Sequence, residues 1–144
     1  MRALLALLFL SQLATADFLE IRKVVEAGQG TLKVKLRKTD EELTLSDTVI
    51  VSRKDLADFS LVPVPQYEIA LNLTDEGGKR MEEATKGSEA GKLRLAILFD
   101  GKAVAAPVVQ HSPLGKSLAI TLGKAEDDKA LAEEIVAKLK QTER

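Results

Sequence analysis

Apolar and polar side chains alternate along much of this chain, a period of two that predicts strands with one buried face. The clearest case is residues 67–73, whose apolar positions are Tyr67, Ile69, Leu71 and Leu73. Similar patterns predict strands over residues 18–25, 31–38, 43–45 and 118–122. Gly28 and Gly30 supply the turn between the first two, and Pro63 and Pro65 interrupt regular structure before the clearest strand.

A β-hairpin is predicted over residues 93–109. Residues 93–99 alternate so that their largest side chains share one face, and residues 104–109 return beside them. Asp100-Gly101 joins the two runs, and this pair favours the positive φ angles of a two-residue primed turn. Pro107 lies in the second strand and has no backbone N–H, which indicates a sheet edge or a bulge at that point.

Two helices are predicted, one in the middle of the chain and one at its end. Thr74 is the expected N-cap of the first, which runs to about Lys86 although Gly77 and Gly78 weaken its first turn. The second opens with residues 126–128, three acidic side chains that suit the positive end of the helix dipole. Its apolar stripe consists of Leu131, Ala132, Ile135, Val136 and Leu139.

A short helical turn is also expected from Ser52 to Ala57, because Ser52 and Asp55 have the spacing of a capping box. The predicted fold class is therefore α+β: a mostly antiparallel sheet with an Asp-Gly hairpin, one mid-chain helix, and a C-terminal amphipathic helix packed on the sheet.

The composition restricts the possible functions. The chain has 144 residues, a formal net charge of -1 and only 3% aromatic residues, so neither charge nor stacking surfaces favour nucleic-acid binding. Cysteine is absent, which excludes disulfides, thiolate metal sites and a cysteine nucleophile.

The first residues predict export from the cytoplasm. Arg2 gives a positive start, residues 3–10 are an unbroken apolar run, and residues 14–16 read Ala-Thr-Ala, a typical cleavage pattern. We therefore expect a signal peptide over residues 1–16 and a single domain over residues 17–144. An uncleaved N-terminal anchor is the alternative. No later segment is apolar enough to predict a membrane span, so the mature domain is expected in the periplasm or outside the cell.

Candidate chemistry is sparse. His111, the single histidine, lies in a predicted loop without a nearby nucleophile motif, so a solvated residue is the favoured interpretation. Lys33, Lys35 and Arg37 alternate along one strand, which indicates a solvated face or, less favoured, a patch for an anionic partner. Two of the three acidic clusters, residues 75–76 and 126–128, lie at predicted helix starts, where negative charge is favoured. The residues predict no catalytic group, no cofactor and no metal site.

Three segments together resemble a known family. They read YEIALNLTDEGGKRMEEATKG, LRLAILFDGKAVAAPVVQ and SLAITLGKAEDDKALAEEIVAKLK, and in this order they are similar to the head subdomain of the large periplasmic loop of SecD and SecDF proteins. Thr74, Glu76 and Gly77 match the family's helix start, residues 95–102 its hairpin, and residues 106–108 its Ala-Pro-Val return strand. Leu122 is inserted relative to the family's Ile-Thr-Gly segment, and the loop at residues 111–117 contains less glycine.

The resemblance implies a non-enzymatic exported module that contacts extended polypeptides, Sec translocase subunits or other envelope proteins. SecD proteins couple export to the proton gradient through membrane helices, and this sequence offers no residues for that role. Strand addition to an exposed sheet edge is the expected binding mode. The candidate edge residues are Ala103, Ala105, Pro107 and Val109. Two alternatives remain open: an envelope assembly module that reuses the fold, and a hydrolase that would depend on His111.

Overall fold

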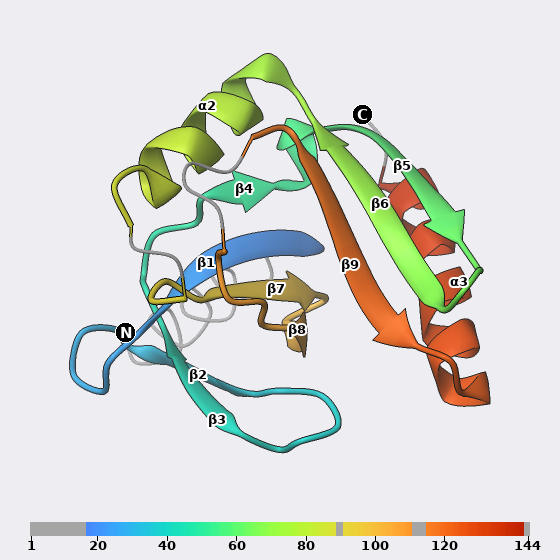
Figure 1. Ribbon diagram of the computed structural model, residues 1–144, viewed down its shortest axis with the longest axis horizontal. Coiled ribbons are helices and arrows are strands. Elements are labelled where there is room, and N and C mark those ends of the chain that lie inside the picture. Colours follow the sequence, from blue (N-terminus) through green and yellow to red (C-terminus); the bar gives the residue numbers. More distant parts are fainter. Residues whose placement is uncertain (1–16, 89–90, 111–114, 143–144) are drawn as a thin grey trace, which may run out of the picture.

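The computed structural model describes residues 17–88, 91–110 and 115–142 and shows two sheets and two α-helices (Figure 1). In chain order the elements are β1 (Leu19–Val25), β2 (Leu32–Lys35), β3 (Glu42–Leu45), β4 (Val51–Ser52), the 3₁₀ helix η1 (Arg53–Asp55), β5 (Leu56–Val62), β6 (Tyr67–Leu73), α2 (Asp75–Thr85), β7 (Leu95–Phe99), β8 (Lys102–Ala105), β9 (Ser117–Gly123) and α3 (Glu126–Gln141). The predicted α+β class with mostly antiparallel pairing is confirmed.

The larger sheet has the strand order β2-β3-β1-β7-β8, with β4 also paired to β1. It curls so strongly that the residue after β2, Leu36, forms a parallel bridge with Ala103 of β8. The two ends of the strand order therefore meet. The smaller sheet has the order β5-β6-β9, and β8 and β9 are thus the last strands of their respective sheets.

The Asp-Gly turn of the hairpin is confirmed. Asp100 has φ of 55° and Gly101 has φ of 79°, and Phe99 pairs with Lys102 on either side of them. The return strand differs from the prediction, because it begins at Lys102 and ends at Ala105. A bulge between the Ile97 and Leu98 pairings shifts its register, and such a shift bends the strand away from a regular ladder.

The largest side chains of β7 share one face, as predicted, but the strand is buried on both faces, because all five of its residues are buried. Leu95, Ile97 and Phe99 contribute to the main core. Ala96 and Leu98 belong to a second core inside the curl of the larger sheet, together with Leu36, Leu43, Leu45 and Ala103. A strand with apolar neighbours on both faces needs no polar alternate positions.

The helix α3 lies along the smaller sheet (Figure 1). Three residues of its predicted apolar stripe are buried, and the other two, Leu131 and Val136, are half-buried. Ala132, Ile135 and Leu139 are in the main core, beside Ile69 and Leu71 of β6. The Arg53 guanidinium donates to the Leu139 carbonyl at 3.0 and 3.3 Å. A cation at this end satisfies a carbonyl that the helix itself leaves free and suits the helix dipole.

The N-terminus of α2 is built as the sequence predicts. The Thr74 hydroxyl accepts a hydrogen bond from Gly77 N–H at 3.1 Å. The glycine has a packing reason, because a Cβ at Gly77 would lie 2.7 Å from the Cβ of Asp55. Two strands were not predicted: β4, which is very short, and β5, which has a bulge near its start. No helix among the described residues is long and apolar enough to cross a membrane.

Candidate functional site

A groove of about 410 Å³ lies where the last strands of the two sheets approach each other. We call it the inter-sheet groove. Its lining comes from three places: residues 104–107 at the end of β8, residues 119–122 of β9, and residues 36–39 after β2, with Ile97 at its base. Another hollow, of about 390 Å³, is bordered by α2 and residues 48–50 rather than by terminal strands, so it offers no ladder groups to a peptide.

The candidate edge residues have different environments. Ala103 and Val109 are buried, Ala105 is half-buried, and Pro107 is exposed. Ala105 and Pro107 line the inter-sheet groove, whereas Ala103 and Val109 do not. The Pro107 carbonyl accepts from Leu95 N–H at 3.0 Å, so this proline holds the chain against β7.

A loop that sequence reasoning did not single out forms one wall of the groove. This loop, residues 36–41, is called the latch below. Its backbone lies against β8, since Arg37 N–H donates to the Ala103 carbonyl at 3.0 Å. Lys38 and Asp40 have φ of 76° and 58°, which makes the loop turn tightly. Its far end is fixed by Glu41, which accepts from the Arg94 guanidinium at 2.9 Å.

A buried carboxylate holds the latch against the smaller sheet and α3. Asp128 accepts from Arg37 at 2.6 Å and from Lys38 at 2.8 Å, and its side chain is 1% exposed. It also accepts from Ala125 N–H at 2.9 Å, which caps α3. The hydrogen bond from Lys38 lowers the pKa of Asp128 well below its usual range; burial opposes this, and Arg37 and Ala125 N–H reinforce it.

Gly123 makes room for this carboxylate. Its φ is 137°, and a Cβ at this position would lie 2.2 Å from Asp128 Oδ2. Only glycine combines that backbone conformation with such a close approach. The last residue of β9 is therefore adapted to the ion-pair cluster.

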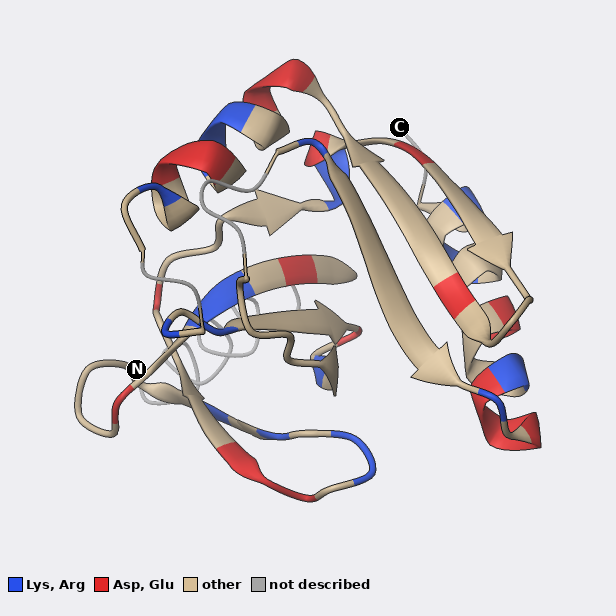
Figure 2. Ribbon diagram, in the orientation of Figure 1, with Lys and Arg blue, Asp and Glu red and all other residues tan. Residues whose placement is uncertain are grey.

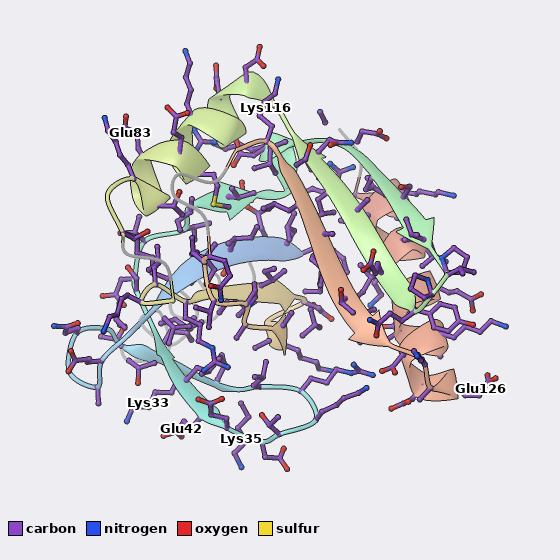
Figure 3. All side chains as sticks on the ribbon, in the orientation of Figure 1. Lys33, Lys35, Glu42, Glu83, Lys116 and Glu126 are labelled. Carbon is purple, nitrogen blue, oxygen red and sulfur yellow. The ribbon has the colours of Figure 1, made fainter. Side chains whose placement is uncertain are left out.

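The alternating cations turn out to have two roles. Lys33 and Lys35 are exposed and point away from the body of the protein, near Glu42 (Figure 3). For these two, the predicted solvated face is confirmed. Arg37 differs, since its side chain is 21% exposed and paired with Asp128. Figure 2 shows the complementary charges, with basic residues along β2 and the following loop and acidic residues at the start of α3.

Other chemistry is limited within the described part of the chain. His111, on which the hydrolase alternative depends, lies outside the described residues. Residues 17–88, 91–110 and 115–142 contain no cluster of three or more His, Cys, Asp or Glu that could hold a metal ion. The arrangement offers strand ends, small apolar side chains and a charged loop, which suit contact with a backbone.

The comparison with protein families bears directly on this arrangement. The sequence model of the family described as SecDF, P1 head subdomain, matches residues 29–141, which is most of the chain. The chain belongs to this family. The match includes the latch, both strands of the inter-sheet groove, and α3. The resemblance inferred from the sequence is therefore confirmed.

Solved SecDF structures are similar to this head subdomain over most of its length. One, of SecDF described as a membrane component that enhances protein export, has a TM-score of 0.60 and 27% identity, covering 84% of this chain and 60% of that one. Another, of SecDF in a super-membrane-facing form, has a TM-score of 0.56 and 26% identity, covering 81% of this chain and 17% of that one. This chain therefore spans only part of both. No curated protein sequence matches it.

Proposed function

We propose that this chain is a non-enzymatic exported module that binds extended polypeptides during or after Sec-dependent export. Its relative SecDF is described as a component that enhances protein export. The proposal depends mainly on one observation: the last strands of two sheets, β8 and β9, border one groove of about 410 Å³. A terminal strand offers backbone groups to an added strand, and small neighbouring side chains permit close approach.

The geometry favours pairing with one edge only. Some Cα atoms of β8 and β9 lie within 8 Å of each other. A strand that bonded both edges would need them about 9.5 Å apart, twice the usual strand spacing. The client therefore pairs with the β8 side, along the segment from Ala103 to Val109, and its side chains pack against residues 119–121 of β9.

Photo-crosslinking in exporting cells tests this function. A photoreactive amino acid replaces Ala105 in the groove or, as the control, Lys33 on the outer face of the β2–β3 hairpin. Adducts with a translocating polypeptide are expected from Ala105 and not from Lys33. Equal yields at the two positions would contradict a binding groove, and adducts confined to folded envelope proteins would favour the assembly alternative.

Export itself is part of the proposal. Residues 1–16 act as a signal peptide, and cleavage after Ala16 leaves Asp17 as the first residue of a periplasmic or extracellular domain. Mass spectrometry of the protein recovered from the envelope tests this. An N-terminus at Met1 would instead identify an uncleaved anchor.

A further inference from the structure

The latch separates two cavities of similar size. The inter-sheet groove has a volume of about 410 Å³, and a second cavity of about 410 Å³ lies on the other side of the latch, beside Lys102 and Asp127. Leu36, Arg37 and Val104 line both. If the latch moved away, the two cavities would join along β8. Residues 102–107 would then border one continuous groove about 20 Å long, the length of an ordinary strand.

The latch contacts β8 in the way that an added strand would. Leu36 is the parallel bridge partner of Ala103, and Arg37 N–H donates to the Ala103 carbonyl at 3.0 Å. That carbonyl is the acceptor that an extended client would need at this position. The protein therefore occupies part of its own candidate binding edge.

We propose that the latch is an autoinhibitory strand, and that an extended polypeptide binds fully only when it displaces Leu36 and Arg37 from β8. This inference rests on the proposed function and adds its regulation. The occupant that replaces the latch is a polypeptide strand whose backbone N–H donates to the Ala103 carbonyl, as Arg37 N–H does in the closed form.

Electrostatic contacts, rather than a large apolar surface, hold the latch closed. Arg37 and Lys38 both donate to Asp128, and Lys38 also donates to the Leu122 carbonyl at 3.3 Å. Leu36 packs in the second core, whereas residues 38–41 of the latch are exposed. Loss of the Asp128 charge should therefore raise the population of the open latch. Because only the open form binds fully, affinity should rise by the same factor.

Thiol labelling measures latch opening without any client. The chain has no cysteine, so Val104→Cys introduces a single thiol at a buried position that lines both cavities. Val51→Cys is the matched control, buried in the main core and absent from both cavity linings. In the full-length protein, Asp128→Asn should accelerate labelling at position 104 about tenfold, with little change at position 51.

A second background separates local opening from general destabilisation. Asp55→Asn also removes a buried carboxylate, but one remote from the latch. Asp55 is bonded to Ser52, beside position 51, so this variant should not raise the labelling rate at position 104 relative to that at position 51. If Asp128→Asn accelerates both positions equally, the latch is only a structural loop and the proposal is wrong.

Peptide binding tests the autoinhibition itself. The probe is a fluorescent synthetic peptide of about ten residues that alternates valine and threonine, a strand-forming sequence. Asp128→Asn should bind it about tenfold more tightly than the wild type, although the variant is less stable. Equal or weaker binding would overturn the proposal.

A reversible disulfide gives the opposite test. Leu36→Cys with Ala103→Cys joins bridge partners whose side chains both lie in the second core, within the reach of a disulfide. The oxidised protein should lose peptide binding, and reduction should restore it. Lys33→Cys with Thr44→Cys staples the same hairpin without tying it to β8, and should bind equally in both redox states.

The two proposals fail in different ways. If neither reduced nor oxidised protein binds the peptide and Ala105 gives no crosslinks, the proposed function fails while the labelling ratio still decides whether the latch opens. If the double variant Leu36→Cys with Ala103→Cys binds as well when oxidised as when reduced, the polypeptide site stands and the autoinhibitory role of the latch is wrong.

Discussion

Asp55 and Asp128 occupy the same local position in two different regions of the protein. Each is the third residue of its helix, and its carboxylate accepts from the backbone N–H of the N-cap residue, Ser52 or Ala125. Both are buried, at 4% and 0% exposure. Each also accepts from a distant arginine, Arg80 for Asp55 and Arg37 for Asp128.

The difference lies in what the arginine belongs to. Arg80 is part of α2, whose neighbouring residue Met81 is fully buried in the main core. Arg37 belongs to the latch, in which only Leu36 packs in the second core and residues 38–41 are exposed. The same capping arrangement therefore holds α2, which packs on the main core, in one region and the latch, which borders the inter-sheet groove, in the other. Contacts that look alike locally can be fixed or releasable, depending on how much apolar packing holds the element that carries the arginine.

The largest expected effect is a loss of global stability when Asp128 loses its charge. Asp128→Asn removes the charge that receives Arg37, Lys38 and Ala125 N–H, and should lower the free energy of unfolding by about 3 kcal/mol. Urea denaturation measures it. Asp127→Asn is the control, because that side chain is 74% exposed and 3.6 Å from Arg37. Equal losses of unfolding free energy in the two variants would show that the buried carboxylate stabilises the protein no more than its exposed neighbour.

Asp55→Asn should cost less, about 2 kcal/mol. The neutral side chain can still accept from Ser52 N–H, and Arg80 keeps its bond to the Ile50 carbonyl at 3.2 Å. The same urea measurement applies. A loss greater than that of Asp128→Asn would reverse the comparison and place the stronger electrostatic anchor in the α2 region.

Gly123→Ala tests the space around Asp128. The new Cβ would meet the carboxylate, and the backbone has φ of 137°. Gly28→Ala is the matched control, with φ of 96° but nothing within 4 Å. Thermal unfolding should show Gly123→Ala to be less stable than Gly28→Ala by about 1 kcal/mol. Equal melting temperatures would mean that backbone strain alone accounts for both.

The smallest expected effect concerns pH: the difference in unfolding free energy between the wild type and Asp128→Asn should not change with pH near neutrality. The folded-state pKa of Asp128 is lowered, so its stabilisation is complete above the unfolded-state pKa of about 3.9 and is lost as pH falls through the lower folded-state pKa. Unfolding free energies of the wild type and Asp128→Asn should therefore differ by the same amount from about pH 8 to pH 5. A gap that narrows within that window would show that Arg37 and Lys38 do not hold the carboxylate ionised.

Local sequence patterns predicted those elements in which the alternation or the turn pair is uninterrupted. The alternation from Tyr67 to Leu73 matches β6 at both ends, and the Asp-Gly pair matches the turn between β7 and β8. In contrast, β5 was missed because the capping-box pattern predicted a helical turn through Ala57, whereas the turn ends at Asp55 and Leu56 already begins the strand. The two-residue strand β4 is too short to leave any period in the sequence.

The candidate site was less predictable because it depends on contacts between distant residues. Arg37 continues the alternation of Lys33 and Lys35, so its sequence pattern gives no sign that it is paired with Asp128. The acidic run at residues 126–128 indicates a helix start, which is correct, but not that one carboxylate is buried. The positive φ at Lys38, a residue type that rarely adopts it, is a structural signal that the sequence did not reveal.

The double burial of β7 also has a consequence for the chain before it folds. Residues 95–99 read LAILF, an uncharged apolar run with strand propensity of the kind that associates between unfolded chains. Arg94 precedes this run, and Asp100 and Lys102 follow it. These charges act as gatekeepers against intermolecular pairing, so the residues that flank the most protected strand of the native protein also guard it while it is still unfolded.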